Sequence, residues 1–421
     1  MKNRTELLFF LIEKASWEVL ISGGGVMKHV IFISDTHIGD GSSKDDFNQD
    51  EVMESLVLDW STLENPELVI VGDGLELLES DAVRKLGVTG FWETVDLIDR
   101  TLIDKIVSVH PKVFKSLANF PGKIWYVVGN HDYYLWKNRS LQQALKEYLP
   151  NLEIVPYYLN TQAGILAVHG NQFDSINKFK EVDGELVPPL GDFIARYMMV
   201  NFDESLRSYV PEEVLRDYDN VRPVLDVFDW LEKISQLYET SVDLMKVWVD
   251  NFLEMMKHEE AKSWMKKNYP ALSKLSILFL NRTGGIRLGE FIVRTVMKVR
   301  NLRKTDYLKK AAMKIFVNPS WMKKNMDGYL DKRKTYDFEH SALNGIVMGH
   351  NHKPSFDVLK IKGELKFYLN CGSWKPVVER RGRNMFQRYF EIFYAITKIE
   401  SDGEIEIITG SINKLRKSQI I

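Results

Sequence analysis

Several features are scarce or missing in this sequence of 421 residues, and each absence narrows the class of protein. The only cysteine is Cys371, so no disulfide can form within the chain, and we expect a reducing compartment such as the cytoplasm. No apolar run approaches the roughly 18 residues of a membrane span, so we expect no transmembrane segment. The formal net charge of −2 creates no overall field that would select a polyanion or a membrane surface.

The sequence also shows no internal repeat and no low-complexity stretch, which excludes a solenoid or a largely disordered protein. Hydrophobic residues make up 45% of the chain and charged residues 27%, values that are ordinary for a globular protein. The length allows one large core with an insertion.

The first 26 residues allow two interpretations. Glycine codons begin with GG, so residues 23–25, directly before Met27, would be G-rich at the nucleotide level, like a bacterial ribosome-binding site. Met27 is then the true start, and residues 1–26 are a translated leader. In the second interpretation this segment is an amphipathic helix packed on the core. In both we treat residues 1–27 as an N-terminal extension.

Short apolar runs rich in β-branched residues predict buried strands, and the stretches between the early runs have helical spacing, as in Met53, Leu56 and Leu63. Alternating strands and helices indicate an α/β fold. After Lys360 the pattern changes to strands with turns between them. The five runs that matter most are residues 29–34, 68–71, 124–128, 165–168 and 345–348.

Residues 175–340 interrupt this pattern. Apolar residues at 3, 4 and 7 spacing, such as Val227, Leu231 and Ile234, predict mostly amphipathic helix. We therefore predict a helical insertion, or lid, between the two parts of a core at 28–174 and 341–412, followed by a tail at 413–421. Within the insertion, residues 294–334 hold 13 Lys or Arg against 3 Asp or Glu.

Polar residues with metal-binding side chains directly follow each of the five apolar runs. Ligands bind outside the carboxyl ends of the strands in an open α/β sheet, so we expect these side chains to meet at one edge. Alone, each has an ordinary structural role as a cap, a turn residue or a core histidine, but five of the nine histidines fall in these segments. The residues are Asp35, His37, Asp73, Asn130, His131, Asp132, His169, His350 and His352.

The residue types point to a two-metal site. Such a site needs one ligand that binds both cations, and a carboxylate such as Asp73 can do so. Mixed imidazole, carboxylate and amide ligands favour Mn²⁺, with Fe, Zn²⁺ or Co²⁺ as alternatives, over Mg²⁺ or Ca²⁺. The lack of cysteine ligands argues against a closed structural zinc site.

The ordered motifs resemble the signature of calcineurin-like metallophosphoesterases. The resemblance covers roughly residues 28–174 and 341–410 and implies a four-layer αββα sandwich with two packed sheets. It also implies that one metal takes Asp35, His37, Asp73 and His352, and that the second takes Asp73, Asn130, His169 and His350. His131 would then be catalytic, with Asp132 orienting it.

The resemblance implies a phosphohydrolase in which a metal-activated hydroxide attacks a phosphoester or pyrophosphate bond. His131 would stabilise the transition state or protonate the leaving group. The expected substrate is a phosphorylated small molecule or a nucleotide-linked compound. The sequence leaves peripheral contact with a membrane open.

The segment around Ser34 to Gly39, together with Glu76 and residues 370–374, resembles the UDP-2,3-diacylglucosamine hydrolase-like branch of the family. That branch typically has arginine where this chain has His131, and an acidic residue where it has Asn171. The insertion is also larger than the lid of that branch, so only the fold and the phosphoester chemistry carry over.

Two other functions are kept as alternatives. A metal-dependent nuclease is one, because the same core serves DNA-repair nucleases and the stretch 294–334 is basic, although a solvated helix face explains that stretch better. A non-enzymatic scaffold built on a phosphoesterase core is the other, and the complete ligand set argues against it.

Overall fold

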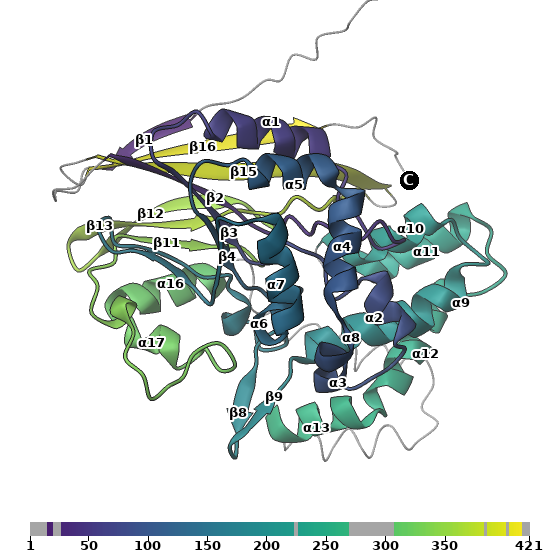
Figure 1. Cartoon of the computed structure of the whole chain (residues 1–421). Helices are drawn as coiled ribbons and strands as arrows, with labels where there is room; N and C mark the ends of the chain where they lie inside the picture. Colours follow the sequence, from purple (N-terminus) through teal and green to yellow (C-terminus); the bar gives the residue numbers. More distant parts are fainter. Residues whose placement is uncertain are drawn as a thin grey trace, which may run out of the picture.

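The computed structural model describes residues 27–222, 226–268, 307–382, 385–400 and 404–414, together with the backbone of residues 15–19. Two sheets pack face to face, and helices cover their outer faces (Figure 1). In the described part of the chain, no helix combines the length and the apolar character that crossing a membrane requires. The predicted four-layer αββα sandwich is confirmed.

The larger sheet has nine strands. Its centre is parallel, and β15 joins it to β16 by antiparallel pairing. Seven strands lie side by side in the order β1 (Ala15–Val19), β16 (Ile405–Lys414), β15 (Met385–Ile399), β2 (Lys28–Ile33), β3 (Pro66–Val71), β4 (Ile124–Val127) and β5 (Leu152–Val155). The other two strands branch from this order: β14 (Val377–Gly382) pairs with β15 and with β10 (Val221–Arg222).

The smaller sheet has five strands in the order β12, β13, β11, β7 and β6. Its central strand β11 runs parallel to both neighbours, and the outer pairs are antiparallel. The strands are β6 (Tyr158–Asn160), β7 (Ile165–Ala167), β11 (Gly345–Met348), β12 (Ser355–Ile361) and β13 (Glu364–Asn370).

The interface between the sheets shows why these runs form strands. Successive side chains of a strand point to opposite faces. In β2, Val30 and Phe32 pack against the second sheet, while Ile31 and Ile33 pack against the helical layer. Because both faces are covered, each strand is apolar throughout, which is the pattern expected of a buried parallel strand.

Helices flank both sheets. The helical layer on the larger sheet comprises α1 (Asp50–Trp60), α4 (Arg100–Val109), α5 (Pro111–Ala118) and α7 (Arg139–Tyr148), with the short helices α2 (Asp81–Lys85), α3 (Phe91–Leu97) and α6 (Tyr133–Lys137) beside it. Beyond the smaller sheet lie α16 (Tyr307–Val317) and α17 (Ser320–Lys323), with short turns η1 (Asn171–Phe173) and η5 (Asp337–Glu339) nearby.

A separate group of helices has its own apolar core. Trp230, Trp248, Phe252 and Trp264 fill this core, which also contacts Val378 and Phe386 of the larger sheet. The helix α12 begins after Asp243, whose carboxylate accepts a hydrogen bond from the backbone N–H of Lys246 at 3.0 Å. The elements are β8 (Lys180–Val182), β9 (Glu185–Val187), α8 (Leu190–Met198), η2 (Met199–Asp203), α9 (Glu204–Leu206), α10 (Glu212–Asp217), η3 (Tyr218–Asn220), α11 (Val227–Leu237), α12 (Leu244–Met256) and α13 (Glu259–Asn268).

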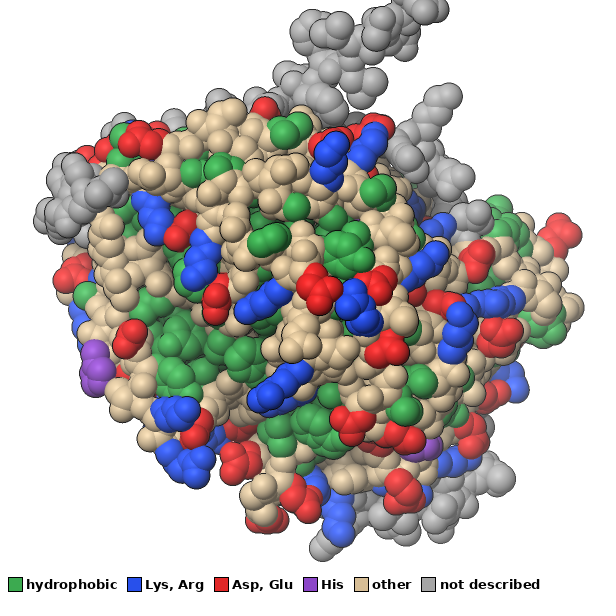
Figure 2. Space-filling view, in the orientation of Figure 1, with side chains coloured by type: hydrophobic (Ala, Val, Ile, Leu, Met, Phe, Trp, Pro, Cys, Tyr) green, Lys and Arg blue, Asp and Glu red, His purple; other side chains and the backbone are tan. Residues whose placement is uncertain are grey.

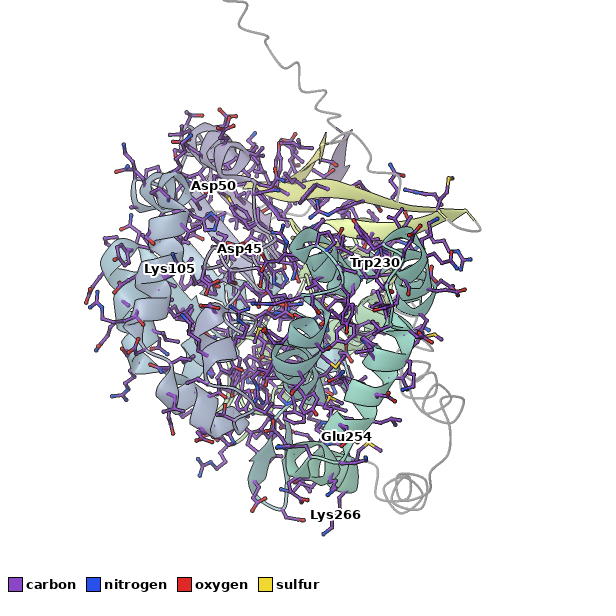
Figure 3. All side chains as sticks on the ribbon, turned by 90° about the vertical axis from the view of Figure 1, so that its right-hand side faces the viewer. Asp45, Asp50, Lys105, Trp230, Glu254 and Lys266 are labelled. Carbon is purple, nitrogen blue, oxygen red and sulfur yellow. The ribbon has the colours of Figure 1, made fainter. Side chains whose placement is uncertain are left out.

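We name residues 188–268 the helical cap. Figure 3 shows the cap helices that carry Trp230, Glu254 and Lys266 beside the part of the core that carries Asp45, Asp50 and Lys105. The helix α16 also falls within the predicted insertion but packs on the smaller sheet, and the segment between α13 and α16 lies outside the described residues. The boundaries at 174 and 341 stay a prediction.

Two expectations need correction. The five strands that precede the candidate ligands do not share one sheet, since β2, β3 and β4 belong to the larger sheet and β7 and β11 to the smaller one. At the N-terminus, residues 15–19 form a strand paired with β16, so the amphipathic-helix interpretation is wrong for these residues. The remainder of residues 1–26 lies outside the described part, and the Met27 start stays a prediction.

Candidate metal centre

The candidate ligands meet where the carboxyl ends of parallel strands from the two sheets converge. One group comprises Asp35, His37 and His352, whose ligand atoms lie within 4.8 Å of one another. A second group comprises Asp73, His169 and His350, again within 4.8 Å. The two groups contain six of the seven predicted ligands. The seventh, Asn130, lines the same cavity as Asp73 and His350.

The backbone at these positions is unusual. Among the described non-glycine residues, nine have positive φ, and five of these nine are predicted ligands with φ between 47° and 70°. The left-handed conformation costs a non-glycine residue roughly 1–2 kcal/mol, and residues with such strain cluster at functional sites. The five are Asp35, His37, Asp73, His350 and His352.

Glycines make room for the carboxylates. A Cβ on Gly129 would lie 2.1 Å from Asp73 Oδ1, and one on Gly349 would lie 2.3 Å from Asp35 Oδ2. Any larger residue at position 129 or 349 would collide with one of these carboxylates, so both positions require glycine. This close approach explains the Gly-Asn-His and Gly-His-Asn-His patterns in physical terms.

In two histidines, a hydrogen bond at Nδ1 leaves Nε2 as the ring nitrogen that can bind a metal. His169 Nδ1 lies 2.9 Å from the carbonyl oxygen of Val71, so Nδ1 carries the proton and Nε2 faces Asp73 Oδ2 at 3.0 Å. His37 Nδ1 lies 2.7 Å from Glu76 Oε2, so this nitrogen is engaged and Nε2 is the ring nitrogen that faces away from Glu76. A histidine held by a carbonyl or carboxylate through one nitrogen is the usual arrangement of a metal ligand.

The donor set fits divalent cations. Within the described part of the chain, the buried His37 Nε2 and the buried Asn130 Oδ1 have no hydrogen-bond partner. An unpaired buried polar atom is costly, and a bound cation would satisfy both. Imidazole nitrogens, carboxylates and an amide oxygen also form the mixed set that suits first-row divalent metals.

Charge at the centre favours a bound cation. Burial opposes ionisation of Asp73, but the histidines around it, led by His169, hold its pKa well below the usual range. Burial lowers the pKa of His169, but Asp73 and Asp35 raise it to about 9. His352 responds in the opposite direction, because burial lowers its pKa to about 3 despite the neighbouring Asp35 carboxylate. The buried carboxylates are therefore stabilised by nearby positive charge, which His169 can supply as a proton and a divalent cation would supply when bound, while His352 stays neutral.

His131 stands beside this centre. Its Nδ1 lies 2.8 Å from Glu76 Oε1, and its ring centroid lies 4.7 Å from that of His37. Burial lowers its pKa, but the Glu76 and Asp73 carboxylates raise it to about 10. His131 lines the cavity and can hold a proton there.

Asp132 was expected to orient His131, but its side chain makes its hydrogen bonds elsewhere. The Asp132 carboxylate accepts hydrogen bonds from Gly74 N at 2.9 Å, Gly129 N at 2.6 Å and the Tyr126 hydroxyl at 2.7 Å. These bonds tie the two ligand loops together. Glu76 takes the expected orienting position at His131. Its sequence signal is its place three residues after Asp73, within the segment that resembles the hydrolase-like branch.

Two cations at the cavity were not predicted from the sequence. Arg222 comes from β10, and its Nη1 donates to the carbonyl oxygens of Asp219 at 2.6 Å and Val221 at 3.0 Å. Its Nη2 lies 3.4 Å from His352 Nδ1. Lys375 Nζ lies 3.6 Å from Glu79 and 3.8 Å from Glu76. Neither residue belongs to a sequence motif that would have predicted its place at the cavity.

The basic stretch 294–334 shows a different arrangement. Residues 294–306 lie outside the described part. In the described part of the stretch, no residue lines the cavity, and several cations pair with local acids. The pairs are Lys309–Asp357, Lys323–Glu339, Lys332–Asp327 and Arg333–Asp331. On the molecular face drawn in Figure 2, positive and negative side chains are interspersed.

Comparison with known proteins agrees with the geometry. Residues 28–196 match the family described as calcineurin-like phosphoesterase. The match includes the strands that lead to Asp35, Asp73, Asn130 and His169, and it ends before β11 and its two histidines. A comparison with curated proteins found no match. The family match and the candidate metal groups indicate metal-dependent phosphoester hydrolysis.

Proposed function

We propose that this protein is a dinuclear metal-dependent phosphohydrolase that cleaves a phosphoester or pyrophosphate bond in a phosphorylated small molecule. The observation that carries the proposal is the pair of carboxylate–imidazole groups that meet at the convergent strand ends, one around Asp35 and one around Asp73. The match of residues 28–196 to the calcineurin-like phosphoesterase family supports the same chemistry.

The first metal would be held by Asp35, His37 and His352, and the second by Asn130, His169 and His350, with Asp73 shared between them. Mn²⁺ suits this set of nitrogen and oxygen donors, and Fe, Zn²⁺ and Co²⁺ are alternatives. Two such cations supply Lewis-acid stabilisation of phosphoryl oxygens and lower the pKa of a bound water.

His131 is proposed as the general acid for the leaving group. The Glu76 carboxylate, whose pKa is held well below the usual range by His131 and His37 against the effect of burial, is an acceptor only. Glu76 therefore keeps the Nδ1 proton of His131 in place and directs Nε2 away from itself. A positioned imidazole that transfers a proton to the leaving oxygen contributes typically 10²–10⁴-fold to the rate.

Arg222 is proposed to hold the phosphoryl group. Two backbone carbonyls fix its guanidinium at the cavity, next to His352. A guanidinium presents several N–H donors in a fixed plane, which suits non-bridging phosphoryl oxygens. Arg222, which lies within residues 188–268, would then add a positive charge to the metal centre, whose ligands follow strands of the two sheets.

A substrate screen tests this function. Chelator-treated protein is reloaded with Mn²⁺ and assayed on phosphomonoesters, phosphodiesters, nucleotides, UDP-sugars and DNA, with Asp73→Ala as the parallel control. We expect metal-dependent hydrolysis of at least one small phosphate compound by the wild type alone. Absence of hydrolysis in every class, or equal hydrolysis by Asp73→Ala, would refute the proposal. Preferential cleavage of DNA would select the nuclease alternative instead.

A further inference from the structure

The candidate metal centre opens into a cavity of about 190 Å³ that residues of the helical cap also line. The wall on the sheet side is polar, because it is built from the candidate ligands and His131. A phosphoryl group at the metals would have its organic part pointing across this space. The chemistry of the opposite wall therefore decides which organic groups fit.

The cap contributes an apolar surface to the cavity. It is formed by Ile194 and Met198 of α8, Val221 of β10, Val227 of α11 and Trp248 of α12, and the polar side chains of Tyr218, Asp219 and Arg222 line the cavity beside it. Met198, Val221, Val227 and Trp248 are each at most 3% exposed and belong to the core of the cap. Four different elements thus supply one apolar surface, and its side chains are held by packing behind them.

The indole of Trp248 makes this surface stiff. Trp248 stacks on Phe252 with ring centroids 5.3 Å apart and an interplanar angle of 9°, and Phe228 packs against it edge-on at 5.3 Å. A side chain packed in this way does not swing aside to admit water. The wall is therefore a preformed apolar contact surface.

The acidic groups at the cavity are engaged with lysines. Glu79 lies 3.6 Å from Lys375 Nζ and 3.9 Å from Lys44 Nζ, and Asp219 also forms an ion pair with Lys44. Lys44 reaches Asp203 of the cap at 3.1 Å as well. These pairs join the cap to the core and offset the charge of Glu79 and Asp219 next to the apolar surface.

We propose that the substrate carries a compact apolar group next to its phosphoryl group, and that this group packs against Val227, Met198 and Trp248 of the cap. This inference rests on the proposed function and adds the substrate class. A hydroxylated group packed against these aliphatic side chains and the indole ring would give up hydrogen bonds to water, whereas an apolar group gains from leaving water. The cavity of about 190 Å³ also has to hold the phosphoryl group, and a cavity of about 150 Å³ accommodates benzene, so the space left for the organic part suits a short chain.

The test compares alkyl esters that share the reacting centre. n-Pentyl phosphate and glycerol 3-phosphate both have a primary alkoxide leaving group and five non-hydrogen atoms in the organic part. We expect kcat/KM of the Mn²⁺-loaded wild type to be at least 10-fold higher for n-pentyl phosphate, since one methylene in an apolar pocket is worth about 10-fold or more. n-Decyl phosphate, kept below its micellar concentration, should gain no further 10-fold.

Two isosteric variants locate the effect. Val227→Thr places a hydroxyl at the wall, and Val249→Thr places the same hydroxyl in the cap core on α12, away from the cavity lining. We expect Val227→Thr to reduce the pentyl-to-glycerol ratio about 5-fold or more, and Val249→Thr to leave the ratio unchanged even where it lowers stability. Because the readout is a ratio, partial unfolding cancels.

The outcomes separate this inference from the proposed function. If the wild type hydrolyses neither ester nor any other phosphate compound, the proposed function fails. If it hydrolyses both esters with equal kcat/KM, or if the two variants change the ratio equally, the proposed function stands and the apolar wall does not select the substrate. A decyl ester preferred at least 10-fold over the pentyl ester would overturn the compact size.

Discussion

Glu76 lies between two imidazoles, with Oε1 2.8 Å from His131 Nδ1 and its other oxygen 2.7 Å from His37 Nδ1. One carboxylate thus orients the proposed general acid and a proposed metal ligand at once. Both imidazoles donate to it through Nδ1, so both have Nε2 available. This arrangement couples the position of His131 to the occupancy of the first metal site.

Replacing Glu76 by glutamine should therefore weaken metal binding and lower kcat at the same time. A glutamine offers one acceptor oxygen, so one of the two imidazoles loses its partner. We expect Glu76→Gln to weaken metal binding about 10–100-fold, the usual cost of losing a partner of a ligand histidine, and to lower kcat even at saturating metal. Isothermal titration with Mn²⁺ and steady-state kinetics measure the two effects. The exposed Glu147→Gln is the matched control, and a Glu76→Gln protein that resembles it in both assays would contradict the coupling.

His131→Ala should separate chemistry from metal binding. Because His131 is proposed to act on the leaving group, kcat should fall about 10²–10⁴-fold while metal content stays at the wild-type level. The loss should be smaller for p-nitrophenyl esters, whose leaving group needs less protonation. Mass-spectrometric metal analysis and kinetics on two leaving groups check this. Loss of one metal in the variant would show that His131 is a ligand instead.

Arg222→Gln should weaken transition-state binding for every phosphate substrate. The guanidinium lies beside His352, so its loss acts at the phosphoryl group and does not depend on the organic part. We expect kcat/KM to fall about 10–100-fold for n-pentyl phosphate and glycerol 3-phosphate alike, since a charge-assisted bond is worth roughly 1.5–3 kcal/mol. Arg100→Gln, on the exposed surface of α4, is the control. An unchanged kcat/KM in Arg222→Gln would exclude the residue from the phosphoryl site.

The fold was largely predictable because the buried strands are short, apolar and followed by polar residues. The division of those strands between two sheets was not, since the run before His169 and the run before Asp73 are both short and aliphatic. Which sheet a strand joins depends on pairing between distant residues. Gly345 of β11 pairs with Ile165 on one side and Phe367 on the other, and no local pattern records this register.

The candidate site was predictable to the level of residue types and less so to the level of contacts. Asp132 follows His131 in sequence, yet its carboxylate points to the backbone of Gly74 and Gly129. Arg222 reaches the cavity because β10 pairs with β14, a contact between residues 221 and 378 that no motif announces. Motifs identify ligands, whereas the residues that orient them depend on tertiary pairing.

A pH-dependent contribution to stability should come from His110. Its Nδ1 lies 2.9 Å from Asp50 and its Nε2 lies 3.1 Å from Asp45, and these carboxylates raise its pKa to about 9 although burial lowers it. A histidine pKa raised above its unfolded value of about 6.5 stabilises the fold fully below pH 6.5, and the effect is lost as the pH rises through 9.

Urea unfolding of wild type and His110→Asn measures this contribution. The difference in unfolding free energy between the two proteins should shrink by about 1–3 kcal/mol between pH 6 and pH 10. His340→Asn, at an exposed position, is the surface control. A difference for His110→Asn that stays constant across this range would contradict the raised pKa.

The central claim, a two-metal catalytic centre, is tested most directly by titrating chelator-stripped protein with Mn²⁺ while bound metal and phosphate release are measured together. We predict about two ions bound per chain, with hydrolysis reaching its maximum only as the second ion binds. Asp73→Ala, which lacks the shared carboxylate, should bind fewer ions and remain inactive. Full hydrolysis by the stripped wild type, or wild-type metal content and hydrolysis in Asp73→Ala, would contradict the account.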